Sequence, residues 1–222
     1  MSNIIYRVNE IFETIQGEGF YTGTPSVFIR MQGCDVGCPW CDTKHTWQIE
    51  PSDECSLGQI LQPPADKQRW AYISAEQLLE LLGTYQARHV VITGGEPCSY
   101  DLYPLTSLLH DHGFFCQIET SGTYEISVDS RSWVTVSPKI GMRGKRNVCK
   151  QAMNRANEVK HPVARKSDIE ELEQLLHKYS IQAIVALQPV SQHPRATQLC
   201  IETCIKMNWR LSIQLHKYIG IF

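Results

Sequence analysis

The chain has 222 residues, with 21 lysines and arginines, 23 aspartates and glutamates, and a formal net charge of −2. This length is sufficient for one domain with a substantial core and no disulfide staples. The near-neutral charge gives no electrostatic basis for binding nucleic acid or an anionic membrane, and no apolar run reaches the ~18 residues that a membrane span needs. We therefore expect a small-molecule partner, no nucleic acid and no membrane.

The first twelve residues, MSNIIYRVNEIF, lack the basic and then apolar pattern of a secretory signal. The chain has nine cysteines, an odd number. In a reducing compartment, clustered cysteines favour metal or redox chemistry over a disulfide framework. We expect a cytoplasmic protein that binds a cofactor at its densest group of cysteines.

Short β-rich runs alternate with helical patterns along the chain. The strand candidates are 26–30, 89–93, 114–119, 133–136, 183–187 and 211–215. Capping-box patterns at Ser74 and Ser167 mark the starts of two helices, a third helix is expected within 196–208, and 120–132 is expected to be a loop. Strands that alternate with helices predict an α/β fold with a parallel sheet.

Residues 48–72 break this alternation with Pro51, Pro63, Pro64 and scattered polar residues. Prolines close together disfavour regular helix and central strand. We interpret the segment as an insertion within a single domain that spans 1–222, and we expect it to cover or flank the functional site.

Residues suited to chemistry follow most of the predicted strands. A group of cysteines follows 26–30, GGEP follows 89–93, and the segments TSG, SPK and QP follow three later strands. In a parallel barrel the carboxyl ends of the strands meet on one face, which is where such folds place active sites. We therefore expect these segments to form one site.

The segment GCDVGCPWCDT places Cys34, Cys38 and Cys41 within eight residues. Thiolates select zinc, copper(I) or iron–sulfur clusters. Structural zinc needs a fourth ligand, which His45 would supply in a Cys₃His site. A four-iron cluster usually takes four cysteines, and when it is held by three, one iron is open to bind and activate a ligand.

With Trp40 before the last cysteine, this segment resembles the cysteine loop of the radical S-adenosylmethionine (SAM) superfamily, whose open iron chelates the amino and carboxylate groups of SAM. The distant segment Gly94-Gly95-Glu96-Pro97 is similar to the GGEP segment of that superfamily. A zinc site has no need of such a segment. We therefore favour a [4Fe-4S] cluster with the ligands Cys34, Cys38 and Cys41.

The segments FETIQGEG (12–19) and GTPSVFIR (23–30), together with the cysteine loop, resemble the 7-carboxy-7-deazaguanine synthase family, in its enterobacterial-type branch. The resemblance implies a carbon–nitrogen lyase that converts 6-carboxy-5,6,7,8-tetrahydropterin to 7-carboxy-7-deazaguanine with loss of ammonia, in queuosine and 7-deazapurine biosynthesis. It implies a shortened, open (β/α) barrel of the radical SAM type with an extended segment after the cysteine loop. It also implies a homodimer and a low-potential electron donor such as flavodoxin.

The same resemblance assigns roles to individual residues. It implies substrate contacts at Ile15, Gln16, Gly17, Arg30 and Thr93, SAM contacts at Gly95, Ser137, Pro138, Lys139 and Gln188, and a Mg²⁺ ion at Thr43. No catalytic side chain is implied, because the reactive species is a radical derived from the cofactor. From the residues alone, Arg30 also fits an ion pair with Asp42 or Glu18, and Thr43 fits a cap or turn residue.

Two other functions are compatible with the cysteine loop. A glycyl-radical-enzyme activating enzyme shares the loop but acts on a protein segment. A zinc-stabilised binding module performs no reaction. The remaining cysteines, including Cys200 and Cys204 on the predicted helix within 196–208, are expected to pack as small hydrophobic residues, and His216 is expected to be structural.

Overall fold

A computed structural model describes residues 4–62 and 68–221. Its strands form one sheet in the order β3-β1-β2-β4-β5-β6-β7-β8-β9, and within the described residues the sheet does not close on itself. The strands are β1 (Ile5–Ile15), β2 (Pro25–Met31), β3 (Ala71–Ser74), β4 (His89–Gly94), β5 (Phe115–Thr120), β6 (Trp133–Val136), β7 (Glu158–Val163), β8 (Ile184–Pro189) and β9 (Arg210–Leu211). The expected shortened, open (β/α) barrel is confirmed.

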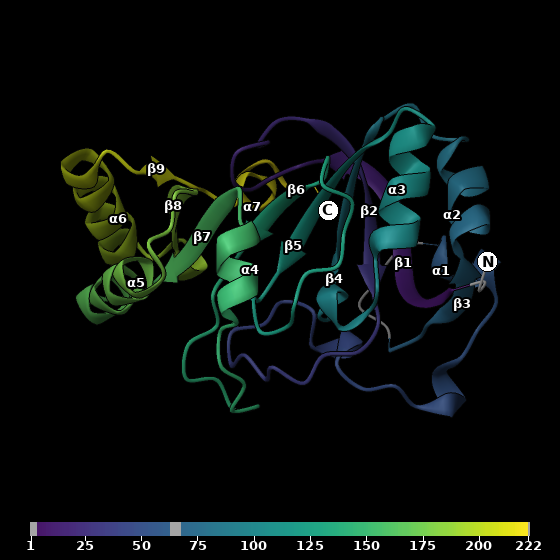
Figure 1. Ribbon diagram of the computed structural model, residues 1–222, viewed down its shortest axis with the longest axis horizontal. Helices are drawn as coiled ribbons and strands as arrows, with labels where there is room; N and C mark the ends of the chain where they lie inside the picture. The colour runs from purple at the N-terminus through teal and green to yellow at the C-terminus, as the bar shows by residue number, and fades with distance from the viewer. Residues whose placement is uncertain (1–3, 63–67, 222) are drawn as a thin grey trace.

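Helices cover the outer face of this sheet (Figure 1). From β2 to β9 each neighbouring pair of strands is parallel, whereas β1 runs antiparallel to both β2 and β3. The helices are α1 (Leu57–Ile60), α2 (Ala75–Leu82), α3 (Tyr103–Asp111), α4 (Lys150–Arg155), α5 (Lys166–Tyr179), α6 (Pro194–Met207) and α7 (Leu215–Ile219). No helix in the described part of the chain is long and apolar enough to cross a membrane.

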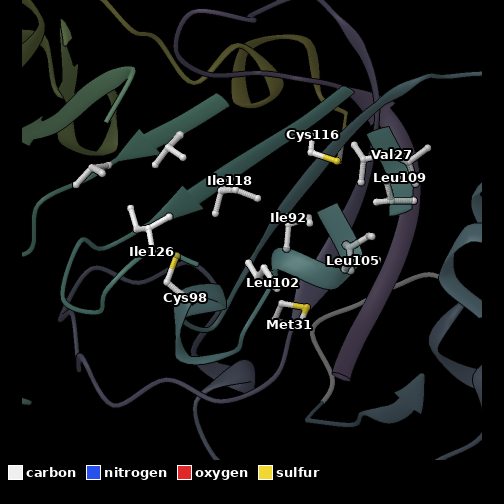
Figure 2. Close-up of a cluster of buried hydrophobic side chains, with 14 of the residues drawn as sticks. Val27, Met31, Ile92, Cys98, Leu102, Leu105, Leu109, Cys116, Ile118 and Ile126 are labelled. Atoms are coloured by element: carbon white, nitrogen blue, oxygen red, sulfur yellow. The ribbon is translucent and has the colours of Figure 1, made fainter. Parts of the chain in front are cut away.

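The outward-facing side chains of the strands form the apolar core. In β4, Val90 and Ile92 belong to this core and alternate with His89, Val91 and Thr93 on the other face, as the two-residue period of a strand requires. Figure 2 shows side chains of β2, β4 and β5 packed against the leucines of α3. Complete burial of each such leucine contributes about 1.5–3 kcal/mol. The apolar outer layer therefore fixes the strands whose ends carry the site.

The inward-facing side chains are polar, and Gln117 is at their centre. Its amide nitrogen donates to Glu119 (3.0 Å) and Thr135 (3.2 Å), and its carbonyl accepts from Gln16 (3.2 Å). The same carbonyl is 2.9 Å from Nε2 of His89, which therefore carries the proton. These bonds use the full hydrogen-bonding capacity of a side chain with no exposed surface.

Aromatic rings close the amino-terminal end of the barrel. Tyr21 packs edge-on against Trp133 at 5.1 Å between ring centroids, and it also contacts Phe115 at 5.3 Å. Phe20 stacks on Trp133 at 4.7 Å. The interior is thus closed at the end where the parallel strands begin, and the opposite end carries the loops described below.

Two of the predicted secondary-structure elements differ from the observed ones, and one predicted loop agrees. The strand expected at 211–215 is largely wrong, because only Arg210–Leu211 pairs with β8 and α7 already begins at Leu215. Helix α5 begins at Lys166, ahead of the predicted cap, because the Asp168 carboxylate accepts from the backbone N–H groups of Ala164 and Arg165. The expected loop at 120–132 is confirmed, since the described structure has no helix between β5 and β6.

The segment 48–72 contains a 3₁₀ turn at Pro51–Asp53, helix α1 and a β-bridge between Glu54 and Trp70. Ile60 and Trp70 are almost completely buried, and β3 begins at Ala71. Pro63 and Pro64, on which the interpretation as an insertion partly depended, lie outside the described residues. That interpretation stays a prediction.

Candidate active site

The cysteine loop, residues 33–47, leaves β2 and folds back on itself. The side chain of Gln32 is fully buried, and its amide donates to the carbonyl groups of Gln48 (2.6 Å) and His45 (3.2 Å). The backbone N–H of Gly33 donates to Thr46, and that of Cys34 donates to Trp47. Both ends of the loop are therefore held at the carboxyl end of β2.

Cys34, Cys38 and Cys41 all line one cavity of about 250 Å³, called the first cavity. Burial raises the pKa of the Cys34 thiol to about 11 and also raises the pKa of Cys38. The sulfur of Cys41 accepts hydrogen bonds from the Thr43 N–H and the Trp47 indole, both at 3.4 Å. Since metal binding ionises a thiol outright, three thiols around one cavity fit an iron–sulfur cluster.

The zinc alternative requires a different arrangement. A zinc ion draws its ligands to within about 2.0–2.3 Å of a single point. Among residues 4–62 and 68–221, no three His, Cys, Asp or Glu side chains are gathered to hold one metal ion. A four-iron cluster binds each thiolate at a different iron, so it does not require the three sulfur atoms to converge on a single point.

The GGEP segment lies directly against the cysteine loop. The N–H of Gly95 donates to Met31, and the N–H of Glu96 donates to the carbonyl of Gly33 (2.8 Å). A Cβ atom on Gly95 would lie 2.2 Å from that same carbonyl oxygen, which is far inside contact distance. Only glycine at position 95 permits this approach, which explains the motif sterically.

Glu96 ties the carboxyl end of β4 to that of β5. Its carboxylate accepts from the N–H of Cys98 (2.9 Å), the hydroxyl of Thr120 (2.6 Å), and both the N–H (2.8 Å) and the hydroxyl of Ser121. The side chain is 1% exposed. Four donors around one buried carboxylate join the ends of β4 and β5 and fix the shape of this wall of the first cavity.

A second cavity, of about 210 Å³, adjoins the first. The walls of both cavities include Glu18, Asp42, Thr93, Glu119 and Lys160. The predicted SAM contacts Gly95, Ser137, Lys139 and Gln188 line the first cavity. The predicted substrate contacts Ile15, Gln16, Gly17, Arg30 and Thr93, together with Thr43, line the second. Of the predicted site residues, Pro138 alone lines neither cavity.

Three of the four charged residues in the shared wall, Glu18, Glu119 and Lys160, form a partly buried triad. The ammonium group of Lys160 donates to Glu18 (2.7 Å) and to Glu119 (2.9 Å). Burial and the negative charge of Glu18 raise the pKa of Glu119 to about 7, against the opposing effect of Lys160. For Glu18 burial is outweighed by Lys160 and Gln214, which lower its pKa to about 2. Glu119 is thus the carboxylate of the triad that can exchange a proton near neutral pH.

Arg30 forms an ion pair with a carboxylate other than the two considered from the sequence. Its Nε donates to Glu10, which has a 6% exposed side chain, while Asp42 pairs with Lys217 and Glu18 with Lys160. The alternative interpretation of Arg30, an ion pair with Asp42 or Glu18, is therefore wrong. Glu10 belongs to β1 and faces Arg30 in the register of the β1–β2 pair, so it orients the guanidinium from the neighbouring strand.

Sequence reasoning did not identify Lys160 and His216 as site residues. Lys160 lies on β7, where Glu158, Lys160 and Pro162 alternate with Val159, His161 and Val163, and it lines the first cavity. His216 lines the second cavity, and its Nδ1 is 2.5 Å from the position of a Cβ on Gly17. Gly17 is therefore required for close packing of α7 on this cavity.

Comparisons with known proteins agree with this geometry. The family model of the Radical SAM superfamily matches residues 28–181. The chain is 56% identical over 220 residues to 7-carboxy-7-deazaguanine synthase of Escherichia coli K12, covering 97% of this chain and 99% of that protein. It is 31% identical to the protein of that name from Synechocystis, covering 98% and 94%. The crystal structure of QueE from Escherichia coli superposes with a TM-score of 0.93 at 56% identity, covering 96% of this chain and 95% of that one.

Proposed function

Because the chain belongs to the 7-carboxy-7-deazaguanine synthase family of the radical SAM superfamily, we propose that its two cavities together perform the ring contraction of that family. The enzyme is a lyase with a small-molecule substrate. The reaction converts 6-carboxy-5,6,7,8-tetrahydropterin to 7-carboxy-7-deazaguanine with loss of ammonia. The observation that carries this proposal is the shared wall, which places a three-cysteine cavity beside a second cavity lined by Gln16 and Arg30.

The first cavity suits the two cofactors of the superfamily. Cys34, Cys38 and Cys41 would hold the [4Fe-4S] cluster, and Gly95 lines the same cavity beside them. The SAM contacts would be Gly95, Ser137, Pro138, Lys139 and Gln188. When bound, the cluster and SAM supply a 5′-deoxyadenosyl radical. The shared wall would hold the pterin within reach of that radical while the closed end of the barrel excludes water.

The second cavity suits a pterin that carries a carboxylate. Arg30, oriented by Glu10, presents the planar fork that binds a carboxylate through two hydrogen bonds. Gln16 is 3% exposed, and its carbonyl accepts from the N–H of Glu18 (3.1 Å), so its amide has a fixed direction. Thr93 adds a contact from the neighbouring strand. Ile15 and Gly17 would contact the ring on either side of Gln16.

A Mg²⁺ ion is proposed at Thr43. This residue precedes the 3₁₀ turn Lys44–Thr46, but its hydroxyl makes no capping hydrogen bond to that turn. The hydroxyl lies 3.6 Å from the sulfur of Cys41 and lines the second cavity. Mg²⁺ prefers oxygen ligands and keeps several waters, so one hydroxyl with substrate oxygens would complete its coordination.

We also propose a homodimer, a low-potential electron donor such as flavodoxin, and a cytoplasmic location. All nine cysteines are free in the structure, which supports a reducing compartment. One sheet extends from β3 to β9, which supports a single domain with the segment 48–72 inserted in it.

An anaerobic assay with the reconstituted protein tests the proposed function. The pterin, SAM, Mg²⁺ and a reductant should give 7-carboxy-7-deazaguanine and ammonia, identified by mass spectrometry and an ammonia assay, and Cys38→Ala should give neither. SAM cleavage without pterin conversion, together with a radical on the glycine of a protein partner, would identify a glycyl-radical activating enzyme instead. A colourless protein that contains zinc would identify the binding module.

A further inference from the structure

A row of buried polar side chains crosses the barrel interior on four neighbouring strands, β4 to β7 (Figure 1). Its members are His89, Gln117, Thr135 and Glu158, and each is hydrogen-bonded to the next, at 2.9, 3.2 and 3.0 Å. His89 is 6% exposed, and the other three have no exposed surface. None of the four lines either cavity of the active site, so none is placed to contact a ligand directly.

Gln117 joins this row to the active site through two further hydrogen bonds. Its carbonyl oxygen accepts from the amide nitrogen of Gln16 at 3.2 Å, and its amide nitrogen donates to the carboxylate of Glu119 at 3.0 Å. Gln16 lines the second cavity, and Glu119 lines both cavities. A side chain outside the two cavities therefore holds two residues that face them.

The direction of both glutamine amides is fixed by groups that cannot turn over. The backbone N–H of Glu18 only donates, and it lies 3.1 Å from the carbonyl oxygen of Gln16, so the amide nitrogen of Gln16 faces Gln117. A reversed Gln117 would place its NH₂ group against that nitrogen and its oxygen against the carboxylate of Glu119. The observed direction avoids both unfavourable contacts, and it also gives His89 an acceptor for its proton.

Gln16 keeps one donor and one acceptor for a ligand. A glutamine amide has two N–H groups and two oxygen lone pairs. Within the described part of the chain, Gln117 accepts from one N–H, and the backbone N–H of Glu18 occupies one lone pair. The side chain of Gln16 is 3% exposed and lines the second cavity, so the remaining N–H and lone pair serve a ligand there. Such a pair matches a ring edge on which a carbonyl group lies next to an N–H, as in the lactam of a pterin.

We propose that Gln117 is a positioning residue, which fixes the amide direction of Gln16 and thereby the ring edge that the second cavity accepts. The inference rests on the proposed function, because it takes the lactam edge of the pterin as the partner of Gln16. Without Gln117, the amide nitrogen of Gln16 loses its acceptor, and the side chain is held by the N–H of Glu18 alone. The site then presents a donor–acceptor pair of undefined direction, and polar groups left unpaired weaken binding of the ring.

Gln117→Met tests the proposal, since methionine keeps the length of the side chain and removes its amide. In the reconstituted holoenzyme, the dissociation constant of oxidised 6-carboxypterin should rise about tenfold, with the iron content unchanged. This probe has the ring edge and the carboxylate but no hydrogen at C6, so it measures binding without turnover. Thr106→Val is the matched control, because Thr106 is equally buried and donates to Leu102 (2.8 Å) in the outer layer. The control variant should bind the probe as the parent does.

A double-mutant cycle shows whether Gln117 acts through Gln16. Gln16→Met should weaken binding of the probe, and the addition of Gln117→Met should weaken it no further. Gln117→Met combined with Arg30→Lys should instead give the product of the two single effects, because Arg30 is oriented by Glu10 and not by Gln117. Unchanged probe affinity in Gln117→Met, or the product of single effects in both cycles, would overturn the proposal.

The proton of His89 tests the network separately from the proposed function. Burial lowers the pKa of His89, so its ring carries a single proton at about pH 8. The nitrogen chemical shifts of the ring should place this proton on Nε2 in the parent protein, a measurement that needs neither a pterin nor a variant. A proton on Nδ1 would require the reverse direction of Gln117 and would overturn the proposal. Failure of the parent to bind the probe, with the proton on Nε2, would contradict the proposed function and support the fixed amide direction.

Discussion

The ammonium group of Lys160 lies 2.9 Å from the carboxylate of Glu119, in the wall that the two cavities share. Glu18 lies 2.7 Å from the same ammonium group, so a single positive charge is shared by two partly buried carboxylates. The pKa of Glu119 is about 7 because burial and Glu18 together outweigh the attraction of Lys160. This buried charge can be detected in the pH dependence of stability.

The stability of the Glu119→Gln variant relative to the parent protein should increase as the pH rises from about 5 to 8. The folded-state pKa of Glu119, about 7, is above its ordinary value of 4.5, so its contribution to stability is complete below about pH 4.5 and is lost towards pH 7. Glutamine does not titrate, so the variant avoids the loss in free energy of unfolding, on the order of 3 kcal/mol, that the parent undergoes as Glu119 ionises. Thermal unfolding at several pH values measures the difference, with the exposed Glu125→Gln as control. Parallel pH profiles for Glu119→Gln and the parent would contradict the assignment.

Glu96→Gln should destabilise the fold by about 1–3 kcal/mol, because a buried donor loses its acceptor. Each carboxylate oxygen of Glu96 accepts from two donors, one oxygen from Cys98 and Thr120 and the other from Ser121. In glutamine one of these oxygens is replaced by an NH₂ group, which would face two donors in place of an acceptor. SAM affinity should fall as well, since the ends of β4 and β5 are no longer held together. Denaturant unfolding and SAM titration measure both effects. The exposed Glu80→Gln on α2 is the matched control, and equal stability of the two variants would refute the clamp.

The sequence predicted that Gly95 and the cysteine loop lie close together, because both follow parallel strands whose carboxyl ends meet at one edge of the sheet. The close approach of Gly95 to the backbone of Gly33 is seen only in the structure. Lys160 could not be found in the same way. Its strand places Glu158, Lys160 and Pro162 on one face and Val159, His161 and Val163 on the other, and this imperfect alternation does not distinguish a polar barrel interior from a strand face in water.

The carboxyl-terminal segment was mispredicted for a tertiary reason. Alternating apolar residues at 211–215 favour a strand, but Gln214 donates to Glu18 (2.9 Å) and the N–H of Leu215 donates to Gly17. These contacts join residues that are nearly 200 positions apart, and they start α7 over the second cavity. Local propensity does not include such contacts, so the position of His216 could not be predicted.

Arg30→Lys should raise the KM for the pterin about tenfold, because a point charge cannot reproduce the bidentate fork. SAM binding should be unchanged, since Arg30 lines the second cavity and not the first. Steady-state kinetics with varied pterin and a separate SAM titration distinguish these effects. Arg88→Lys, at an exposed position, is the control. An unaltered pterin KM in Arg30→Ala would give Arg30 a structural role through Glu10 alone.

Thr43→Ala should blunt activation by Mg²⁺, and Thr43→Ser should largely preserve it. The turn after Thr43 is held by backbone atoms, since its carbonyl accepts from the Thr46 hydroxyl (2.8 Å) and its own hydroxyl makes no cap. Alanine would therefore remove the proposed Mg²⁺ ligand without disturbing the turn. Mg²⁺ titrations of turnover, at equal iron content, measure the effect. A parental Mg²⁺ response in Thr43→Ala would show that the hydroxyl is not a ligand.

Cys38→Ala should lose the cluster, whereas Cys200→Ala should keep it. Both thiols are buried, with exposures of 9% and 0%, so burial alone does not separate them. Cys38 lines the first cavity with Cys34 and Cys41, and a cube deprived of one of only three thiolates loses a corner ligand. Cys200 lies on α6 within the apolar core, and its loss should cost about 1 kcal/mol of packing. Iron analysis and visible absorption report the cluster independently of turnover. A full complement of iron in Cys38→Ala, or its absence from Cys200→Ala, would require a different ligand set.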